Sequence, residues 1–186
     1  MPAPSTAHIG DLGLSQPPIF LTDLDRCQPA DALSAEARLG RWRTWTYSTE
    51  AFRGTLLYAG DNTAAPEVTY PLRVRGWHAV SIGQMVHDHE LYEWSGDLLV
   101  KLSNERGFTQ LNLPERINRL PGGGVQLTET FFKVADLTGQ DVKFKQVAVS
   151  SEPNRTDRIF DCLPARAAYI KLVPLTDGEV AALKAD

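Results

Sequence analysis

Three stretches decide the fold that this sequence predicts: Val68–Gly83 (VTYPLRVRGWHAVSIG), Phe131–Phe144 (FFKVADLTGQDVKF) and Ala167–Leu175 (AAYIKLVPL). In each, apolar and polar residues alternate, which is typical of a strand with one buried face. Gly, Pro or an Asp-Leu-Thr-Gly turn bounds each stretch, and similar short runs recur from Arg41 to Val173. Many short strands at this spacing predict an all-β fold, an antiparallel β-sandwich of the jelly-roll kind, over residues 41–175.

The same alternation predicts the core. Side chains two residues apart on a strand point to the same face, so the apolar members of each run should pack together. We expect the following residues to be buried: Val80, Ile82, Val100, Leu102, Phe132, Val134, Phe144, Ile170 and Leu172.

The two ends of the chain differ from its middle. Residues 1–40 are expected to form a flexible N-terminal arm, because proline and small polar residues are frequent at its start. Within it, Ala30–Leu39 (ADALSAEARL) contains good helix formers before Gly40 and predicts a short helix. Thr176-Asp177-Gly178-Glu179 is a capping-box pattern, so residues 176–186 should begin a linker helix to a downstream domain.

Composition excludes some classes of partner. The formal net charge is −4 and acids and bases are mixed, so we expect no nucleic-acid partner. No apolar run approaches the roughly 20 residues that span a bilayer, so no membrane is expected. The N-terminus lacks the basic and apolar regions of a secretory signal, which favours the cytoplasm. Cys27 and Cys162 are then two reduced thiols; the alternative is one disulfide that ties the arm to the segment before the last strand.

A family resemblance follows from the order of four motifs: Gly76–Gly83, Val100–Ser103, Phe132–Gly139 and Tyr169–Leu175. They resemble the N-terminal β-sandwich of uncharacterised bacterial multidomain proteins, in which a glycoside-hydrolase-like (β/α) barrel follows the sandwich. More loosely, the chain is similar to galactose-binding-like jelly rolls used as carbohydrate-binding modules. The resemblance covers about residues 41–175. It implies that catalytic carboxylates would lie in a downstream domain, and it assigns no catalytic residue to this chain.

Aromatic residues are the candidates for carbohydrate binding. Flat rings stack on the apolar faces of sugars, while polar groups at the edge fix the orientation of the ligand. Trp45, Tyr92 and Trp94 are the expected carbohydrate-binding residues, and Trp77 is a further candidate. The alternative is that such rings anchor the core, because tryptophan buries a large area in a sandwich.

Two groups of residues could bind metal ions. The cluster His87-Asp88-His89-Glu90 offers imidazole and carboxylate ligands, and in an extended segment His87 and His89 face the same way. The alternative for this cluster is a solvated loop. Asp136 and Asp141 flank the Leu-Thr-Gly turn and could hold a structural Ca²⁺. The alternative there is that Asp136 caps its own turn.

The functional expectation is a non-catalytic accessory domain of a glycoside-hydrolase-like protein. It would pack on the downstream catalytic domain and contact carbohydrate near that active site. No Gly-x-Ser-x-Gly motif is present, and Pro121–Gly124 lacks the Lys-Ser/Thr of a phosphate loop. We therefore do not expect this chain alone to be an enzyme, although a parent protein could be a glycoside hydrolase. The alternatives are a small metal-dependent enzyme that uses the His87–Glu90 loop, and a purely structural interaction module.

Overall fold

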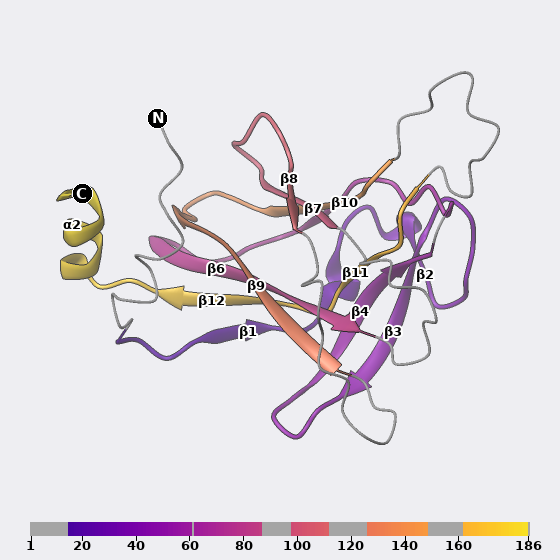
Figure 1. Cartoon of the computed structure of the whole chain (residues 1–186), viewed down its shortest axis with the longest axis horizontal. Coiled ribbons are helices and arrows are strands. Elements are labelled where there is room, and N and C mark those ends of the chain that lie inside the picture. Colours follow the sequence, from indigo (N-terminus) through magenta and orange to yellow (C-terminus); the bar gives the residue numbers. More distant parts are fainter. Residues whose placement is uncertain (1–14, 61, 87–97, 112–125, 149–161, 186) are drawn as a thin grey trace.

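The computed structural model describes residues 15–60, 62–86, 98–111, 126–148 and 162–185, in which twelve strands form three four-stranded sheets (Figure 1). The first sheet has the order β1 (Ile19–Leu21), β12 (Tyr169–Pro174), β6 (Trp77–Val86), β9 (Gln126–Asp136). The second has the order β5 (Val68–Tyr70), β10 (Val142–Gln146), β7 (Leu98–Leu102), β8 (Thr109–Leu111). The third has the order β11 (Ala165–Ala167), β4 (Arg53–Ala59), β3 (Trp42–Ser48), β2 (Leu33–Ser34).

The architecture is β-rich, sandwich-like and mainly antiparallel. Each pairing between named strands is antiparallel except that of β2 with β3. Helices account for 12% of the described residues, far below the roughly one third of an average globular protein. The predicted dominance of short antiparallel strands with little helix is thereby confirmed.

The main core lies where the inner faces of the three sheets meet, and it contains Trp42, Leu57, Ile82, Phe144 and Leu172. Of the nine residues predicted to be buried, all except Val134 are buried.

Val134 is only partly buried because β9 carries a bulge. Val80 pairs with Lys133 whereas Ser81 pairs with Phe131, so Phe132 has no partner and the alternation of β9 changes there. Val134 consequently lies opposite Ala79, on the other face from Val80. Its neighbour Ala135 packs against the core instead.

The predicted helix over Ala30–Leu39 is wrong. The chain forms a single 3₁₀ turn, η2 (Ala30–Ala32), and then β2, in which Leu33 pairs in parallel with Trp42 of β3. A ten-residue helix has little stability of its own, and burial of Ala32 in the main core favours the extended path.

The chain also enters the sheets before residue 41. In β1, Ile19–Leu21 pair with Leu172–Ile170 of β12. A second 3₁₀ turn, η1 (Leu24–Arg26), follows β1 and buries Leu24 in the main core. Residues 1–14 of the expected arm lie outside the described residues.

The predicted capping box is confirmed at the start of helix α2 (Asp177–Ala185). The Thr176 amide donates to Glu179 Oε2 (2.6 Å), and the Glu179 amide donates to Thr176 Oγ1 (3.3 Å). Ser15 also donates to Glu179 Oε1, from its amide at 2.9 Å and from its hydroxyl at 3.2 Å. Glu179 therefore ties the start of the described chain to the helix beyond β12.

Within the described ranges, no helix has the length and apolar character needed to cross a membrane.

Cys27 is buried, Cys162 is partly exposed, and both are free thiols, so the alternative of a disulfide between them is wrong.

Candidate functional site, an arginine-lined pocket

A pocket of about 320 Å³ opens beside the third sheet. Its described lining comes from the segment between β2 and β3, from β3 and β4, and from the turn after β4: Ala37, Arg38, Leu39, Arg41, Arg43, Tyr58, Gly60 and Thr63. Pockets that bind small ligands begin at roughly 300 Å³, so this one suits a ligand of one small ring.

The strand register places the principal side chains. Arg43 of β3 pairs with Tyr58 of β4, and Tyr58 pairs with Arg166 of β11. Residues that pair across strands share a face of the sheet. Trp42 and Leu57, their neighbours in sequence, point into the core. Arg43, Tyr58 and Arg166 therefore form one row on the face of the sheet opposite the main core, where Tyr58 packs against a second hydrophobic cluster.

The rim of the pocket is held by a backbone contact. The Gly40 amide donates to the Thr63 carbonyl at 2.6 Å, which joins the segment before β3 to the turn after β4. Gly40 has φ +72°, a left-handed conformation that favours glycine. This turn brings Arg38 and Arg41 to the same pocket as Arg43.

The lining is strongly basic. Within the described residues, Arg38 alone among the lining arginines has an acidic partner, Glu36 at 3.5 Å, and both of these side chains are largely exposed, so the pair is weak. Arg41 and Arg43 make no ion pair within the part of the chain that the structure describes. The Nε of Arg43 is buried and has no hydrogen-bond partner. An unsatisfied buried donor is costly, and such groups in native proteins often mark a site where a partner binds.

Arg166 adds a buried cation behind the pocket. Its side chain is 5% exposed, and its guanidinium carbon lies 5.1 Å from the centre of the Tyr58 ring. Burial lowers the pKa of Arg166, while its contact with the Tyr58 phenol acts in the opposite direction. Because arginine stays protonated in proteins, this group keeps its charge and strengthens the positive field at Tyr58.

The predicted sugar-binding residue Trp45 lies beside this pocket. It follows Arg43 by two residues on β3 and so shares its face, and the residue is 44% exposed. The Arg43 guanidinium carbon lies 5.7 Å from the centre of the Trp45 ring. Trp42, by contrast, is a core anchor whose indole N–H donates to the Pro66 carbonyl at 2.7 Å. Trp77 is partly buried, and the Lys184 ammonium lies over its ring.

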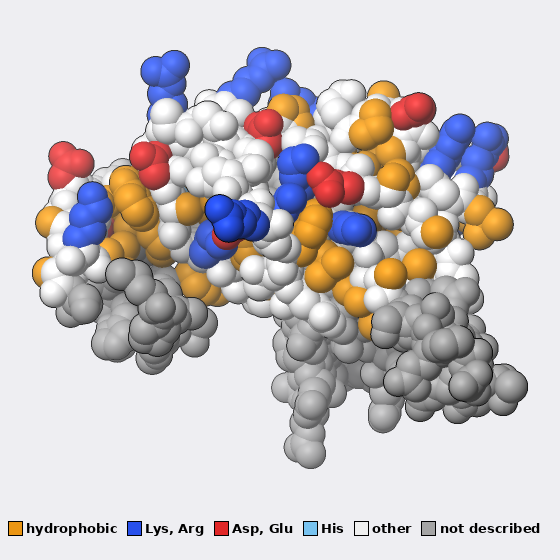
Figure 2. All heavy atoms as spheres, turned by 90° about the horizontal axis from the view of Figure 1, so that it is seen from above, with side chains coloured by type: hydrophobic (Ala, Val, Ile, Leu, Met, Phe, Trp, Pro, Cys, Tyr) orange, Lys and Arg blue, Asp and Glu red, His pale blue; other side chains and the backbone are white. Residues whose placement is uncertain are grey.

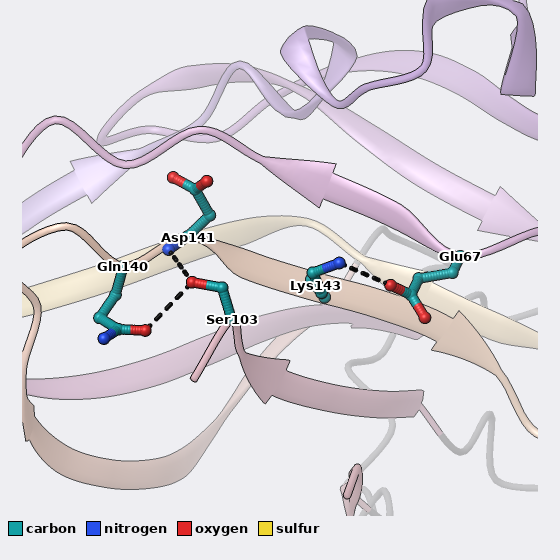
Figure 3. A network of polar contacts seen from close by, with 5 residues as sticks. All are labelled: Glu67, Ser103, Gln140, Asp141 and Lys143. Atoms are coloured by element: carbon teal, nitrogen blue, oxygen red, sulfur yellow. Dashed lines mark hydrogen bonds and ion pairs between the residues drawn. The ribbon is translucent and has the colours of Figure 1, made fainter. Parts of the chain in front are cut away.

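The two aspartates considered as calcium ligands, Asp136 and Asp141, both accept hydrogen bonds from the backbone. Asp136 is exposed and accepts from the Thr138 amide at 3.0 Å, and this bond lowers its pKa. Asp141 accepts from the Leu72 amide at 3.0 Å. Figure 3 shows the Ser103 hydroxyl between Gln140 and the Asp141 amide, which fixes the turn before β10. The geometry matches the alternative in which Asp136 caps its turn.

The other predicted site residues cannot be placed. His87, His89, Tyr92 and Trp94 lie outside the described residues, as does the rest of the His87–Glu90 cluster. Among the residues that the structure does describe, no group of three or more His, Cys, Asp or Glu could hold a metal ion.

Sequence reasoning missed the arginines. One signal was present: in Arg41–Tyr47 (RWRTWTY), Arg43 and Trp45 lie on the face opposite Trp42, so burial of Trp42 would expose both. Tyr58 and Arg166 carried no comparable signal, because only the pairing of β3, β4 and β11 brings them to Arg43.

Comparisons with protein-family models, curated proteins and solved structures find no match for this chain. The resemblance to glycoside-hydrolase-like proteins therefore stays an expectation, and the pocket itself is the basis for a functional proposal.

Proposed function

We propose that this chain is a non-catalytic binding domain whose arginine pocket holds the carboxylate of an acidic sugar. One observation carries the proposal: Arg41 and Arg43 line the pocket without an acidic partner in the described chain, directly beside the exposed ring of Trp45. The guanidinium groups supply the charge, and the indole supplies the flat apolar surface.

The chemistry of these groups suits a uronic acid. The planar guanidinium group can donate two parallel hydrogen bonds to one carboxylate, which lysine cannot do. The exposed face of Trp45 can pack on the C–H face of the pyranose, and burial of that area favours binding by about 25 cal/mol per Å² at most. The Tyr58 hydroxyl group adds a polar contact in the same lining.

Binding is favoured over catalysis by what lines the pocket. Its described lining contains no carboxylate, imidazole or thiol. General acid–base chemistry on a glycoside needs a pair of carboxyl groups at a defined separation. The arrangement supports recognition of an anion rather than cleavage of a bond.

This binding role fits the wider functional expectation, which we retain as part of the proposal. The chain would be a jelly-roll accessory domain that packs on a glycoside-hydrolase-like catalytic domain and presents acidic carbohydrate to it. Support comes from the β-rich, sandwich-like fold and from the position of the pocket on the sheet face opposite the main core.

Calorimetry tests the proposal with matched ligands and variants. Galacturonate should bind and galactose should give no heat, because only the former has a carboxylate. Arg43→Gln should weaken binding about tenfold or more, since a charged hydrogen bond contributes roughly 1.5–3 kcal/mol. Arg53→Gln is the control: Arg53 is exposed at the far end of β4 and forms no ion pair in the described chain. Equal binding of galactose, or an unaffected Arg43→Gln variant, would refute the proposal.

The purely structural alternative has one observation in its favour. Strand β1 is an edge of the first sheet, and Ile19 and Phe20 on it are 39% and 40% exposed. A protein partner could add a strand there. Phe20→Ser would abolish such an association in analytical ultracentrifugation without changing galacturonate binding.

A further inference from the structure

The outer face of the second sheet carries three lysines. Lys101 of β7 pairs directly with Lys143 of β10, and Lys145 lies two residues further along β10 on the same face. The intervening residues point the other way, and Val100, Val142 and Phe144 are fully buried. Figure 2, which views the molecule from above Figure 1, shows Lys and Arg side chains spread over that face, with Asp and Glu side chains among them.

Positive charge exceeds negative charge on this face. Glu67 accepts a hydrogen bond from Lys143 at 2.8 Å, and Lys143, Lys101 and Lys145 all lower its pKa. Figure 3 shows this pair at the surface of β10. Lys101 and Lys145 form no ion pair with any described residue. Among the described residues, the ion pairs therefore give these three ammonium groups one carboxylate partner, Glu67, although the chain as a whole is acidic.

The lysines are also held close together. The ammonium groups of Lys101 and Lys145 lie 4.8 Å and 5.9 Å from the centre of the same ring, that of Phe108. Like charges directly opposite each other on a sheet destabilise it, so the pairing of Lys101 with Lys143 reduces the stability of the fold. An extended anion that spans the strands would relieve the repulsion among all three.

We propose that this lysine face, formed by Lys101, Lys143, Lys145 and Phe108, is a second binding site, for the carboxylates of an acidic polysaccharide chain. It rests on the proposed function for the type of sugar, because the arginine pocket selects an acidic sugar unit. The two sites have different tasks. The pocket holds one unit in a fixed orientation, whereas the lysines, as compact and mobile charges, attract a longer chain without defining its geometry.

Two other polyanions fit this face less well. Single-stranded nucleic acids need open aromatic rings on which bases stack, and two ammonium groups already lie over Phe108. Binding in a membrane interface needs large apolar side chains at the surface. The large apolar residues that are exposed in the described chain are Ile19, Phe20, Leu39 and Trp45, none of which is on the second sheet.

The experiment compares oligogalacturonate with galacturonate, on the parent and on two double variants. Lys101→Gln/Lys145→Gln removes two charges from the lysine face. Arg53→Gln/Lys184→Gln removes two exposed charges from β4 and α2 and is the matched control. Calorimetry at several NaCl concentrations gives affinity and its salt dependence, and thermal melting checks that each variant is folded.

We expect oligogalacturonate to bind the parent at least about tenfold more tightly than galacturonate does. The logarithm of its affinity should fall with the logarithm of the salt concentration at a slope near −2. The three lysines would neutralise three anionic groups, and each neutralised group releases roughly 0.7 counterion. The lysine variant should lose this gain and most of the slope while binding galacturonate normally. The control should behave as the parent.

The other outcomes separate the two proposals. Unchanged oligogalacturonate binding by the lysine variant overturns the lysine face and leaves the pocket intact, as does an oligomer that binds no better than galacturonate. If the parent protein does not bind galacturonate but still binds the oligomer through the lysines, the pocket proposal is refuted and the lysine face is supported. Equal affinity for single-stranded DNA or for anionic vesicles overturns the specific assignment to polysaccharide.

Discussion

The ring of Tyr169 lies across Gly83 so closely that no side chain could be accommodated at position 83. Gly83 pairs with Tyr169 of β12 on one side and with Glu129 of β9 on the other. The Tyr169 hydroxyl crosses the central strand above this glycine and donates to Glu129 Oε2 at 2.9 Å. One tyrosine thus links three strands of the first sheet, and Phe20 and Phe52 pack on its ring.

This contact makes Gly83→Ala a strongly destabilising substitution. The added methyl group must displace the Tyr169 ring, and overpacking of this kind costs about 1–3 kcal/mol before loss of the bond to Glu129. Gly107→Ala is the control, because a Cβ there meets no atom within 4 Å. Urea unfolding should show the large loss only for Gly83→Ala; similar midpoints for the two variants would mean that the ring moves aside freely.

The bulge in β9 predicts different costs for two neighbouring apolar residues. Phe132 packs in the main core, so Phe132→Ala should lower the free energy of unfolding by about 3–5 kcal/mol. Val134 is only partly buried on the other face, and Val134→Ala should cost clearly less. Denaturant titration of both variants checks this order, and the reverse order would place the bulge elsewhere.

The capping box predicts how α2 responds to acid. Hydrogen bonds from the Thr176 and Ser15 amides lower the pKa of Glu179 below its ordinary value of 4.5. A carboxylate with a lowered pKa stabilises the fold above its ordinary value, and this contribution is lost as the pH falls through the lowered value. The Ser15 and Thr176 amide resonances should therefore titrate together with a midpoint below 4.5. In Glu179→Gln this titration should vanish, whereas persistence of it would assign the effect to another carboxyl group.

Thr176→Ala tests the other half of the same capping box. Removal of the hydroxyl leaves the Glu179 amide without its acceptor, and loss of such a cap costs about 1 kcal/mol. The loss should appear as faster amide exchange in α2 with little change in the sheets. Thr176→Ser should restore protection because it keeps the hydroxyl group.

Repulsion on the lysine face predicts a substitution that stabilises the protein. Lys101→Gln removes the charge directly opposite Lys143, and a gain of about 0.2–1 kcal/mol is expected at low salt. High salt should diminish the gain, because exposed charges are screened. Lys171→Gln is the contrasting variant, since it breaks a 2.8 Å ion pair with Glu129 and should not stabilise. A loss of stability in Lys101→Gln would show that its contact with Phe108 outweighs the repulsion.

Some features were predictable from sequence because they depend on near neighbours. Alternation along one strand determined that Val80 and Ile82 point to one side, and burial of both followed once any sheet covered that side. The capping box needs only residues three apart, Thr176 and Glu179, and it formed as predicted. Such local rules hold whatever the order of the strands.

The candidate site could not be predicted in the same way. Trp45 was identified from its ring, but the pocket beside it requires Arg43, Tyr58 and Arg166 to share one row across three strands. The register that aligns them is set by packing of the whole core. Nothing within any one of the three segments specifies which residue of another it will face.

The sequence by itself determined that the chain is β-rich, which face of most strands is buried, and where the last helix starts. Only the tertiary structure decided that residues 30–34 form a 3₁₀ turn and strand β2 rather than the start of a helix, that the bulge turns Val134 away from Val80, and that arginines gather at one pocket. The physical reason is the range of the interactions. Side-chain alternation and capping act between residues a few positions apart, whereas strand pairing acts between residues up to more than a hundred positions apart, as for Tyr58 and Arg166.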